Sequence, residues 1–223
     1  MYFLFRNRLM YFSLNIPQEL ASSFPSLKKL IKGNTKDFAD KLTALEALGV
    51  PTEGTTWDEP FGGVGASAAL ASYHGMTVTI NELSPELVGY LKGAYPEVTC
   101  QNALSMDMKK TACRFYDPSN FTFNHLCAAF SRALKTTQQT MFYTDVFPYS
   151  MKPFDCCKLK GYLKKCSGYL FNEGWFIQGI YLYRSRNAMV VKIERKEPAL
   201  AFSIIDGRAY TDVVQISLGK GLL

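Results

Sequence analysis

The residues best suited to chemistry are three glycines and two acids in the first half of the chain. Gly62, Gly63 and Gly65 form a turn with little side-chain bulk, and Glu59 stands just before it. Glu82 closes the next apolar segment. Glycines let the backbone turn tightly and let a ligand approach the main chain. A carboxylate after a second strand can accept two hydrogen bonds from a ribose diol, so this set predicts a site for a nucleoside-containing ligand.

The surrounding segments have the patterns needed to hold these residues in place. We expect a buried strand at 55–61, a helix at 66–73 and a second strand at 76–80. The small residues of the helix suit close packing on a sheet, and its first turn presents unpaired N–H groups to a ligand. The same pattern also fits a tight turn in an α/β core that binds nothing.

Two kinds of cofactor compete for this turn. Gly63, Gly65 and Ala68, followed by Glu82, satisfy the dinucleotide fingerprint. Glu59, however, directly precedes the turn, where its carboxylate would repel a pyrophosphate. S-adenosylmethionine carries no phosphate, and its ammonium and sulfonium are cations. The position of Glu59 therefore favours S-adenosylmethionine.

Residues 59–65, Glu-Pro-Phe-Gly-Gly-Val-Gly, resemble the E-P-F-x-G-x-G motif of class I S-adenosylmethionine-dependent methyltransferases. The form is closest to that of Dam-like (D12 class) DNA adenine methyltransferases. Residues 80–87 resemble the second motif of that family, N-D-x-N-x-x-L, with Glu in place of Asp. The resemblance implies S-adenosyl-L-methionine as cofactor. The implied cofactor-binding residues are Glu59, Phe61, Gly63 and Gly65 for the methionine part, Glu82 for the ribose, and Leu83 for the adenine.

Asn102 and Ala103 follow the third expected strand, where the family often has an Asp that contacts the adenine amino group. The resemblance therefore implies that these two residues also bind the cofactor, with Asn in place of Asp.

The acceptor site is expected at residues 117–121, Asp-Pro-Ser-Asn-Phe, after the fourth strand. In open α/β sheets the reacting group lies at the carboxyl ends of the strands. This stretch resembles the Asp/Asn/Ser-Pro-Pro-aromatic motif of DNA amino-methyltransferases, with Ser in place of the second Pro and the aromatic ring one position late. The resemblance implies that Asp117 touches the cofactor and orients the acceptor nitrogen, assisted by Pro118 and Asn120. Phe121 would stack on a base turned out of its helix.

A target-recognition insertion, which Dam-like enzymes carry before this motif, is absent from the expected place. Only residues 108–116 separate Asp107 from Asp117. We therefore expect recognition of any nucleic-acid sequence to come from the N-terminal extension, the C-terminal part or a protein partner.

The whole pattern predicts an α/β fold, a Rossmann-like doubly wound and mostly parallel sheet with a late antiparallel hairpin, plus an N-terminal helical extension. The expected domains are the extension at 1–54 and a methyltransferase domain at 55–223. Residues 1–14 suit an arm or strand. Further expected helices are at 26–48 (divided at 33–34), 84–95, 124–134 and 153–166, and further strands at 98–101, 114–118, 141–147, 175–184, 188–195, 201–205 and 213–218.

The charge pattern is compatible with nucleic acid as partner but does not require it. The 223 residues carry a net charge of +6. Candidate phosphate contacts lie on the N-terminal helix and on the hairpin, namely Lys28, Lys29, Lys32, Lys36 and Lys41, and Arg184, Arg186, Lys192, Arg195 and Lys196. A solvated helix surface and a charged sheet edge are equally ordinary explanations of these residues.

Other features favour a cytoplasmic protein without a metal. There is no apolar run long enough to cross a membrane and no signal-peptide pattern. The six cysteines form no C-x-x-C pair and only two histidines could join them, so we expect free thiols rather than a zinc site. The preferred function is methylation of nucleic acid, most simply a DNA adenine amino group. A small-molecule or protein methyltransferase, or a catalytically silent cofactor-binding subunit, remains an alternative.

Overall fold

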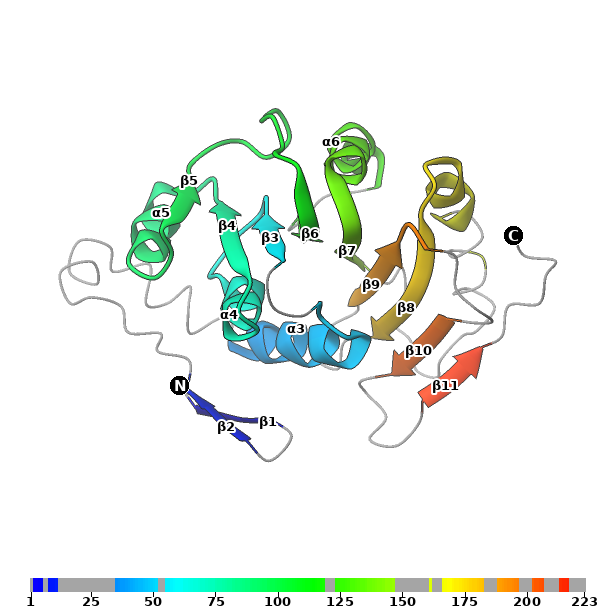
Figure 1. Cartoon of the computed structure of the whole chain (residues 1–223), viewed down its shortest axis with the longest axis horizontal. Coiled ribbons are helices and arrows are strands. Elements are labelled where there is room, and N and C mark those ends of the chain that lie inside the picture. Colours follow the sequence, from blue (N-terminus) through cyan, green and yellow to red (C-terminus); the bar gives the residue numbers. More distant parts are fainter. Residues whose placement is uncertain are drawn as a thin grey trace.

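The chain folds around one mixed β-sheet that has helices on both faces (Figure 1). The computed structural model describes residues 2–5, 8–11, 35–51, 55–118, 123–146, 161, 166–182, 188–196, 202–206 and 213–216. The strands are β1 (Tyr2–Phe5), β2 (Arg8–Tyr11), β3 (Thr56–Glu59), β4 (Thr77–Asn81), β5 (Glu97–Thr99), β6 (Thr111–Tyr116), β7 (Thr137–Val146), β8 (Phe176–Leu182), β9 (Ala188–Glu194), β10 (Phe202–Asp206) and β11 (Val213–Ile216). The helices are α3 (Thr35–Leu48), α4 (Ala66–Tyr73), α5 (Pro85–Lys92), α6 (Phe123–Thr136) and one at residues 166–172.

The main sheet runs in the order β11-β10-β8-β9-β7-β6-β3-β4-β5. The strands from β7 through β6, β3 and β4 to β5 are all parallel. β9 lies antiparallel between β7 and β8, while β10 pairs in parallel with β8 and β11 pairs antiparallel with β10. β1 and β2 form a separate antiparallel pair. The carboxyl ends of the parallel strands therefore meet along one edge, where open α/β sheets bind ligands.

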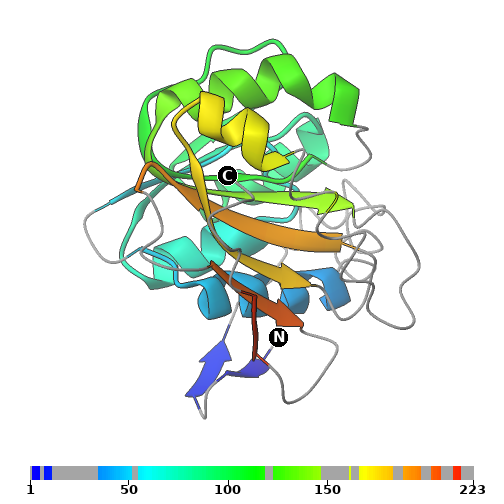
Figure 2. The same cartoon turned by 90° about the vertical axis from the view of Figure 1, so that its right-hand side faces the viewer.

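Each face of the sheet has its own apolar core. α3 and α4 cover one face, and α6 with the helix at 166–172 covers the other (Figure 2). The first core is built around Trp57, whose ring centroid lies 5.8 Å from that of Phe142 and 6.4 Å from that of Phe115. Because side chains alternate along a strand, Tyr116 and Met141 point to the second core.

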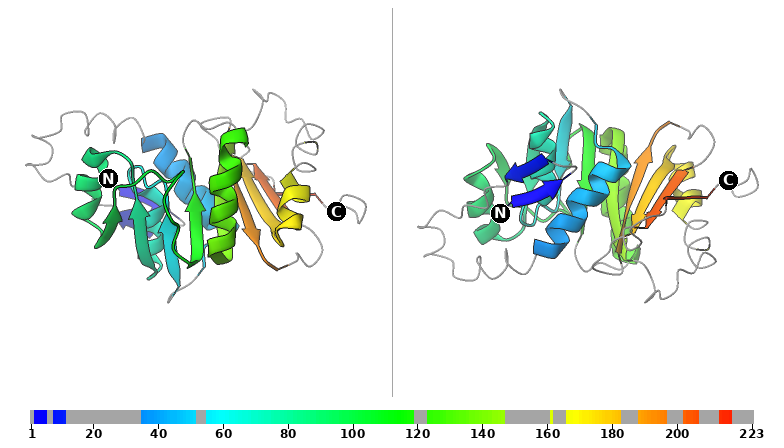
Figure 3. Two further views of the ribbon diagram at one scale, coloured as in Figure 1. Left: turned by 90° about the horizontal axis from the view of Figure 1, so that it is seen from above. Right: turned by 90° about the horizontal axis from the view of Figure 1, so that it is seen from below.

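α3 is part of the first core, although the sequence assigns it to an extension that ends at residue 54. The helix crosses beneath the sheet (Figure 3) and packs on α4, β8 and β9. Ala44 and Leu45 are fully buried there. None of the helices in the described part of the chain is both long and apolar enough to span a membrane.

The sheet confirms the expected fold class. The expected antiparallel hairpin is β8 with β9, and the two tail strands, which the sequence could not place, are β10 and β11 at the sheet edge. β3 is shorter than the expected strand at 55–61, because Pro60 lacks the N–H that a further ladder bond requires. The expected helix at 153–166 lies almost entirely outside the described residues, as does the first part of the helical pattern at 26–48.

A buried ion pair joins the central strands beneath the second core. Arg114 on β6 is fully buried, and its Nε donates to Asp58 Oδ2 on β3 at 2.7 Å. Its other nitrogens donate to the Ala133 carbonyl on α6 at 2.8 Å and to the Lys109 carbonyl at 2.8 Å. Asp58 also accepts a hydrogen bond from Thr79 on β4 at 2.9 Å. Strands β4, β3 and β6 and helix α6 are thus held by one polar network.

We predict that Asp58→Ala destabilises the protein by about 3–5 kcal/mol, because it leaves the Arg114 guanidinium buried without its counter-charge. Urea unfolding followed by circular dichroism measures the loss. Glu97→Ala, which removes an exposed acid, is the matched control and should change the free energy of unfolding by no more than about 0.5 kcal/mol. A loss below about 1 kcal/mol for Asp58→Ala would contradict the role given to the pair.

Candidate functional site

The three glycines after β3 serve different purposes. A Cβ on Gly62 would lie 2.3 Å from Ile80 Cγ2, so this residue lets the turn pack against β4. Gly65 has a φ of 76°, and its Cβ would lie 2.9 Å from Leu91 Cδ2. Gly63 has a φ of 52°, and its Cβ would meet no atom within 4 Å. Gly63 therefore presents bare main chain to open space, as the approach of a ligand requires.

Asn81, which the sequence analysis did not single out, fixes the edge on which the site lies. Its Nδ2 donates to the carbonyls of Pro60 and Gln101, at 3.0 and 2.9 Å. Its Oδ1 accepts from Thr99 Oγ1 at 2.9 Å and from the Gln101 N–H at 3.0 Å. This buried amide uses its full hydrogen-bonding capacity to join the ends of β3, β4 and β5. The only sequence signal was a polar residue closing an apolar strand.

Glu82 is held against the glycine turn by three main-chain hydrogen bonds. Gly63 N–H donates to its Oε2 at 2.7 Å. The N–H groups of Leu83 and Ser84 both donate to its Oε1 at 2.9 Å. A carboxylate has about four acceptor positions, so a ribose diol would take the remaining one and compete with Gly63 for another. The structure thus brings together Gly63 and Glu82, two of the residues predicted to bind the cofactor.

The expected adenine-binding residues lie beside Glu82, but they differ in exposure. Leu83 is 63% exposed, which is unusual for a large apolar side chain and suits a flat ring packed on it. The Leu83 carbonyl accepts a hydrogen bond from Cys100 Sγ at 3.6 Å, so the loops after β4 and β5 are neighbours. Asn102 is exposed and its Oδ1 accepts from the Leu104 N–H at 3.0 Å. Ala103 is buried.

Glu59 is the most unusual group of the site. Its side chain is 0% exposed, and neither carboxylate oxygen has a hydrogen-bond partner. Burial raises the pKa of Glu59 well above its ordinary value of 4.5, Lys41 lowers it, and Asp117 raises it further. The Trp57 indole N–H is close enough to favour the ionised form, but the two groups do not meet hydrogen-bond geometry. A buried carboxylate without partners is costly, which makes it a candidate ligand-binding group.

Asp117 lies near Glu59 at the end of β6. It forms an ion pair with Lys41 Nζ from α3 and accepts a hydrogen bond from Thr144 Oγ1 on β7. The side chains of Lys41 and Asp117 are only 19% and 10% exposed. Lys41 therefore points to the strand ends and pairs with Asp117, whereas the sequence offered it either as a phosphate contact or as part of a solvated helix surface. Among the described residues, no three His, Cys, Asp or Glu side chains are grouped closely enough to hold a metal.

The remaining predicted acceptor residues are only partly visible. Pro118 is half-buried beside Asp117, whereas Asn120 and Phe121 lie outside the described residues, so their roles stay predictions.

The basic hairpin is engaged within the protein at two of its positions. Lys192 Nζ lies 3.1 Å from Glu194 Oε1 and donates to the Gly49 carbonyl at 3.1 Å. Arg195 lies over the Trp175 ring, 4.7 Å from its centroid. Lys192 could bind a phosphate only by giving up both of these contacts. The number of basic residues in the hairpin sequence therefore overestimates how many positive charges are available to a ligand.

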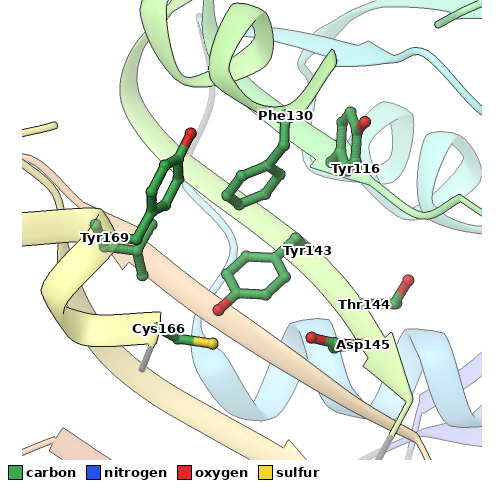
Figure 4. Close-up of a pocket in the computed structure, with 8 residues that line it drawn as sticks. Tyr116, Phe130, Tyr143, Thr144, Asp145, Cys166 and Tyr169 are labelled. Carbon is green, nitrogen blue, oxygen red and sulfur yellow. The ribbon is translucent and has the colours of Figure 1, made fainter. Parts of the chain in front are cut away.

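An aromatic pocket opens at the ends of β6 and β7 on the α6 side (Figure 4). The pocket is a narrow, partly open space between these side chains, and only a small part of it is enclosed. The lining residues are Tyr116, Phe130, Tyr143, Thr144, Asp145, Cys166, Tyr169 and Leu170. The sequence analysis missed this pocket, because its rings come from two strands and two helices that are far apart in the chain.

A continuous series of ring contacts connects this pocket with the glycine turn. Phe61 meets Tyr116 edge to face at 5.0 Å, and Tyr116 meets Phe130 in the same way at 5.4 Å. Phe130 in turn contacts Tyr143 at 5.1 Å and Tyr169 at 6.3 Å. Phe61, predicted to line the methionine part of a cofactor, therefore contacts Tyr116, which lines the pocket.

Comparison with known proteins gives a fold but no sequence family. No protein-family model matches the chain, and no curated protein matches it. Among solved structures, magnesium protoporphyrin IX methyltransferase from Synechocystis PCC 6803 with bound SAM is similar, with a TM-score of 0.55 and 14% identity, over 84% of this chain and all of that one. The chain has the fold of class I S-adenosylmethionine-dependent methyltransferases.

Two further structures with this fold show how widely it is used. An S-adenosylmethionine-dependent methyltransferase from Mesorhizobium loti has a TM-score of 0.53 and 12% identity, over 68% of this chain and 96% of that one. The pyocyanin biosynthetic protein PhzM has a TM-score of 0.56 and 8% identity, over 83% of this chain and 63% of that one. At such identities the similarity establishes the fold, and the function of this chain must be argued from its own site.

We predict that Glu59→Gln stabilises the unliganded protein at neutral pH. Unfolded Glu59 ionises near pH 4.5, whereas its raised pKa makes the folded protein hold that proton to higher pH. The folded state then binds more protons, so this group costs stability as pH rises above 4.5. Gln cannot ionise, so the unfolded variant gains nothing from losing a proton, and the variant should be more stable than wild type by at least about 1 kcal/mol at pH 7.5, the scale of one pKa unit.

Urea unfolding of wild type, Glu59→Gln and the exposed control Glu97→Gln measures this gain at several pH values. The advantage of Glu59→Gln should disappear as pH falls towards 4.5, and Glu97→Gln should show no such trend. Equal stability of wild type and Glu59→Gln at every pH would mean that the buried carboxylate is already compensated.

Proposed function

We propose that this protein is an S-adenosylmethionine-dependent methyltransferase whose preferred acceptor is an amino group of a nucleobase in nucleic acid. The observation that carries the proposal is the Glu59 carboxylate, fully buried and without partners at the start of the glycine turn. A carboxylate in that condition is stabilised by a cation that also donates hydrogen bonds, as an ammonium does.

The site fits this cofactor better than a dinucleotide. Gly63 offers main chain facing open space, but Glu59 and Asp117 both place negative charge near the turn. Lys41 offsets one of these charges through its ion pair with Asp117, so the group keeps one net negative charge. That charge would repel a pyrophosphate and attract a methionine ammonium and a sulfonium.

The nucleoside part of the cofactor has matching partners on the next strand. Glu82 would accept from the ribose hydroxyls, exchanging the hydrogen bond that Gly63 now donates to it. The exposed Leu83 would pack on the adenine, beside the loop that carries Asn102. These positions follow one another along the carboxyl edge of β3, β4 and β5, as the expected motif order requires.

Asp117 and the aromatic pocket provide the groups that an acceptor needs. The cofactor would supply an electrophilic methyl group on its sulfonium. Asp117 would accept a hydrogen bond from the acceptor NH₂ and direct the nitrogen lone pair to that methyl carbon; it would also stabilise the charge that develops on nitrogen. Tyr143, Phe130 and Tyr169 would hold a flat ring, and closing it in their pocket would exclude water.

A small aromatic molecule is the second candidate acceptor, favoured by the partly enclosed and mainly apolar pocket. Nucleic acid is preferred, because the acceptor motif at 117–121 resembles that of DNA amino-methyltransferases and the net charge is +6.

Calorimetric titration with S-adenosylmethionine and with NAD tests the cofactor. We expect micromolar binding of S-adenosylmethionine, at least about tenfold weaker binding by Glu59→Gln and Glu82→Ala, and no change in Glu97→Gln; losing one charge-assisted hydrogen bond accounts for such a factor. Binding of NAD alone would overturn the proposal. Absence of binding to either would assign the glycine turn a structural role.

Methyl transfer from labelled S-adenosylmethionine tests the acceptor. With DNA, RNA, nucleosides and small aromatic amines offered separately, we expect transfer to a nucleobase. Asp117→Asn should lower turnover about 100-fold, the usual effect of removing one group that stabilises transition-state charge. Its affinity for S-adenosylmethionine should weaken by no more than about tenfold. Cofactor binding with no transfer to any acceptor would instead favour a cofactor-binding subunit.

The pocket has its own variant, Tyr143→Ala, which should raise KM for the acceptor and leave the cofactor Kd unchanged. Phe171→Ala is the matched control, because Phe171 is an exposed ring on the helix at 166–172 and does not line the pocket. An unchanged KM in Tyr143→Ala would place the acceptor elsewhere.

A further inference from the structure

Lys41 introduces a positive charge at the strand ends, where the proposed cofactor is itself cationic. Its ammonium reaches Asp117 from α3, a helix whose position beneath the sheet is fixed by Ala44 and Leu45 in the first core. The ion pair is four-fifths or more buried on both sides, so solvent screens it only weakly. Lys41 is therefore a fixed part of the electrostatic field at this edge of the sheet.

Among the described residues, Lys41 and Asp117 are the charged groups with the largest effect on Glu59, ahead of Asp58. Glu59 and Asp117 are the acids. Lys41 forms an ion pair with Asp117, and its charge lowers the pKa of Glu59. Two carboxylates alone would attract any cation strongly. With Lys41 present, one of the two negative charges is already neutralised by the protein.

We propose that Lys41 determines how strongly the site prefers S-adenosylmethionine over its demethylated product, S-adenosylhomocysteine. The inference rests on the proposed function. The two molecules differ by the sulfonium charge, because transfer of the methyl group leaves a neutral thioether. The Lys41 ammonium repels the sulfonium and has no such effect on the thioether, so it narrows the difference in affinity between methyl donor and product.

This role is useful for turnover rather than for binding. Attraction of the sulfonium by two carboxylates would stabilise the bound donor before reaction, and binding of the ground state alone does not accelerate the chemical step. During transfer the positive charge leaves sulfur and develops on the acceptor nitrogen. Because Lys41 pairs with Asp117, the bound S-adenosylmethionine is stabilised less strongly before reaction. The Asp117 carboxylate nevertheless stays in position to orient the acceptor. Lys41 is thus a specificity-determining and positioning residue.

Calorimetry with both ligands tests the inference on wild type, Lys41→Met, Lys41→Arg and Lys135→Met. Met keeps the length and apolar stem of Lys41, and Arg keeps its charge. Lys135 is an exposed lysine in the last turn of α6, so its loss matches the change in net charge. The ratio Kd(S-adenosylhomocysteine)/Kd(S-adenosylmethionine) should rise about tenfold in Lys41→Met, the scale of one charge acting across several ångströms at an effective dielectric constant near 20. It should stay within about twofold of wild type in the other two variants, since both keep a cation at position 41.

The ratio separates electrostatic and structural roles, because a damaged site would weaken both ligands together. Circular dichroism melting shows whether each variant is folded. If Lys41→Met does not fold, the test uses Lys41→Arg and Lys41→Gln instead. The ratio of the two Kd values should then match wild type in Lys41→Arg and be higher than wild type in Lys41→Gln. An unchanged ratio in folded Lys41→Met would overturn the inference and leave the proposed function intact. Failure of wild type to bind either ligand would overturn both.

Discussion

The buried guanidinium of Arg114 is the constraint on which the arrangement of the site depends. Removing this charge from water is costly, and the structure compensates it with Asp58 and with main-chain carbonyls of α6 and of the loop before β6. The same Asp58 holds Thr79, so the network fixes the spacing of β4, β3 and β6. Because these strands carry Glu82, Glu59 and Asp117 at or just beyond their carboxyl ends, the relative positions of those acids follow from it.

Two neighbouring acids on β3 differ in whether their buried carboxylates have partners. Asp58 and Glu59 are adjacent, and strand alternation turns them to opposite faces of the sheet. Asp58 has an ion pair and a hydroxyl donor, whereas both oxygens of Glu59 lack a partner. Asp58 thus has the partners that a buried polar group requires, whereas Glu59 does not. Buried polar groups without partners are expected mainly at functional sites.

The fold by itself does not select a reaction, since structures that share it bear names as different as porphyrin methyltransferase and pyocyanin biosynthetic protein. What distinguishes this chain is the surroundings of the strand ends. On one face Lys41 pairs with Asp117, and on the other Tyr143, Phe130 and Tyr169 form a pocket. Phe61 and Tyr116 meet edge to face, so the cofactor and acceptor regions of the proposal are in contact through these two rings.

The sequence by itself determined the local units: the strand, glycine turn and helix around Gly63, the acid at Glu82, and the hairpin of β8 and β9. These follow from short-range periodicity and turn chemistry, which the chain carries within a few residues. Only the tertiary structure decided that Lys41 faces Asp117 rather than solvent, that Lys192 is engaged internally, and that four distant rings form one pocket. Those facts depend on which residues come into contact across the sheet. Such contacts between distant residues cannot be read from side-chain type or from spacing along the chain.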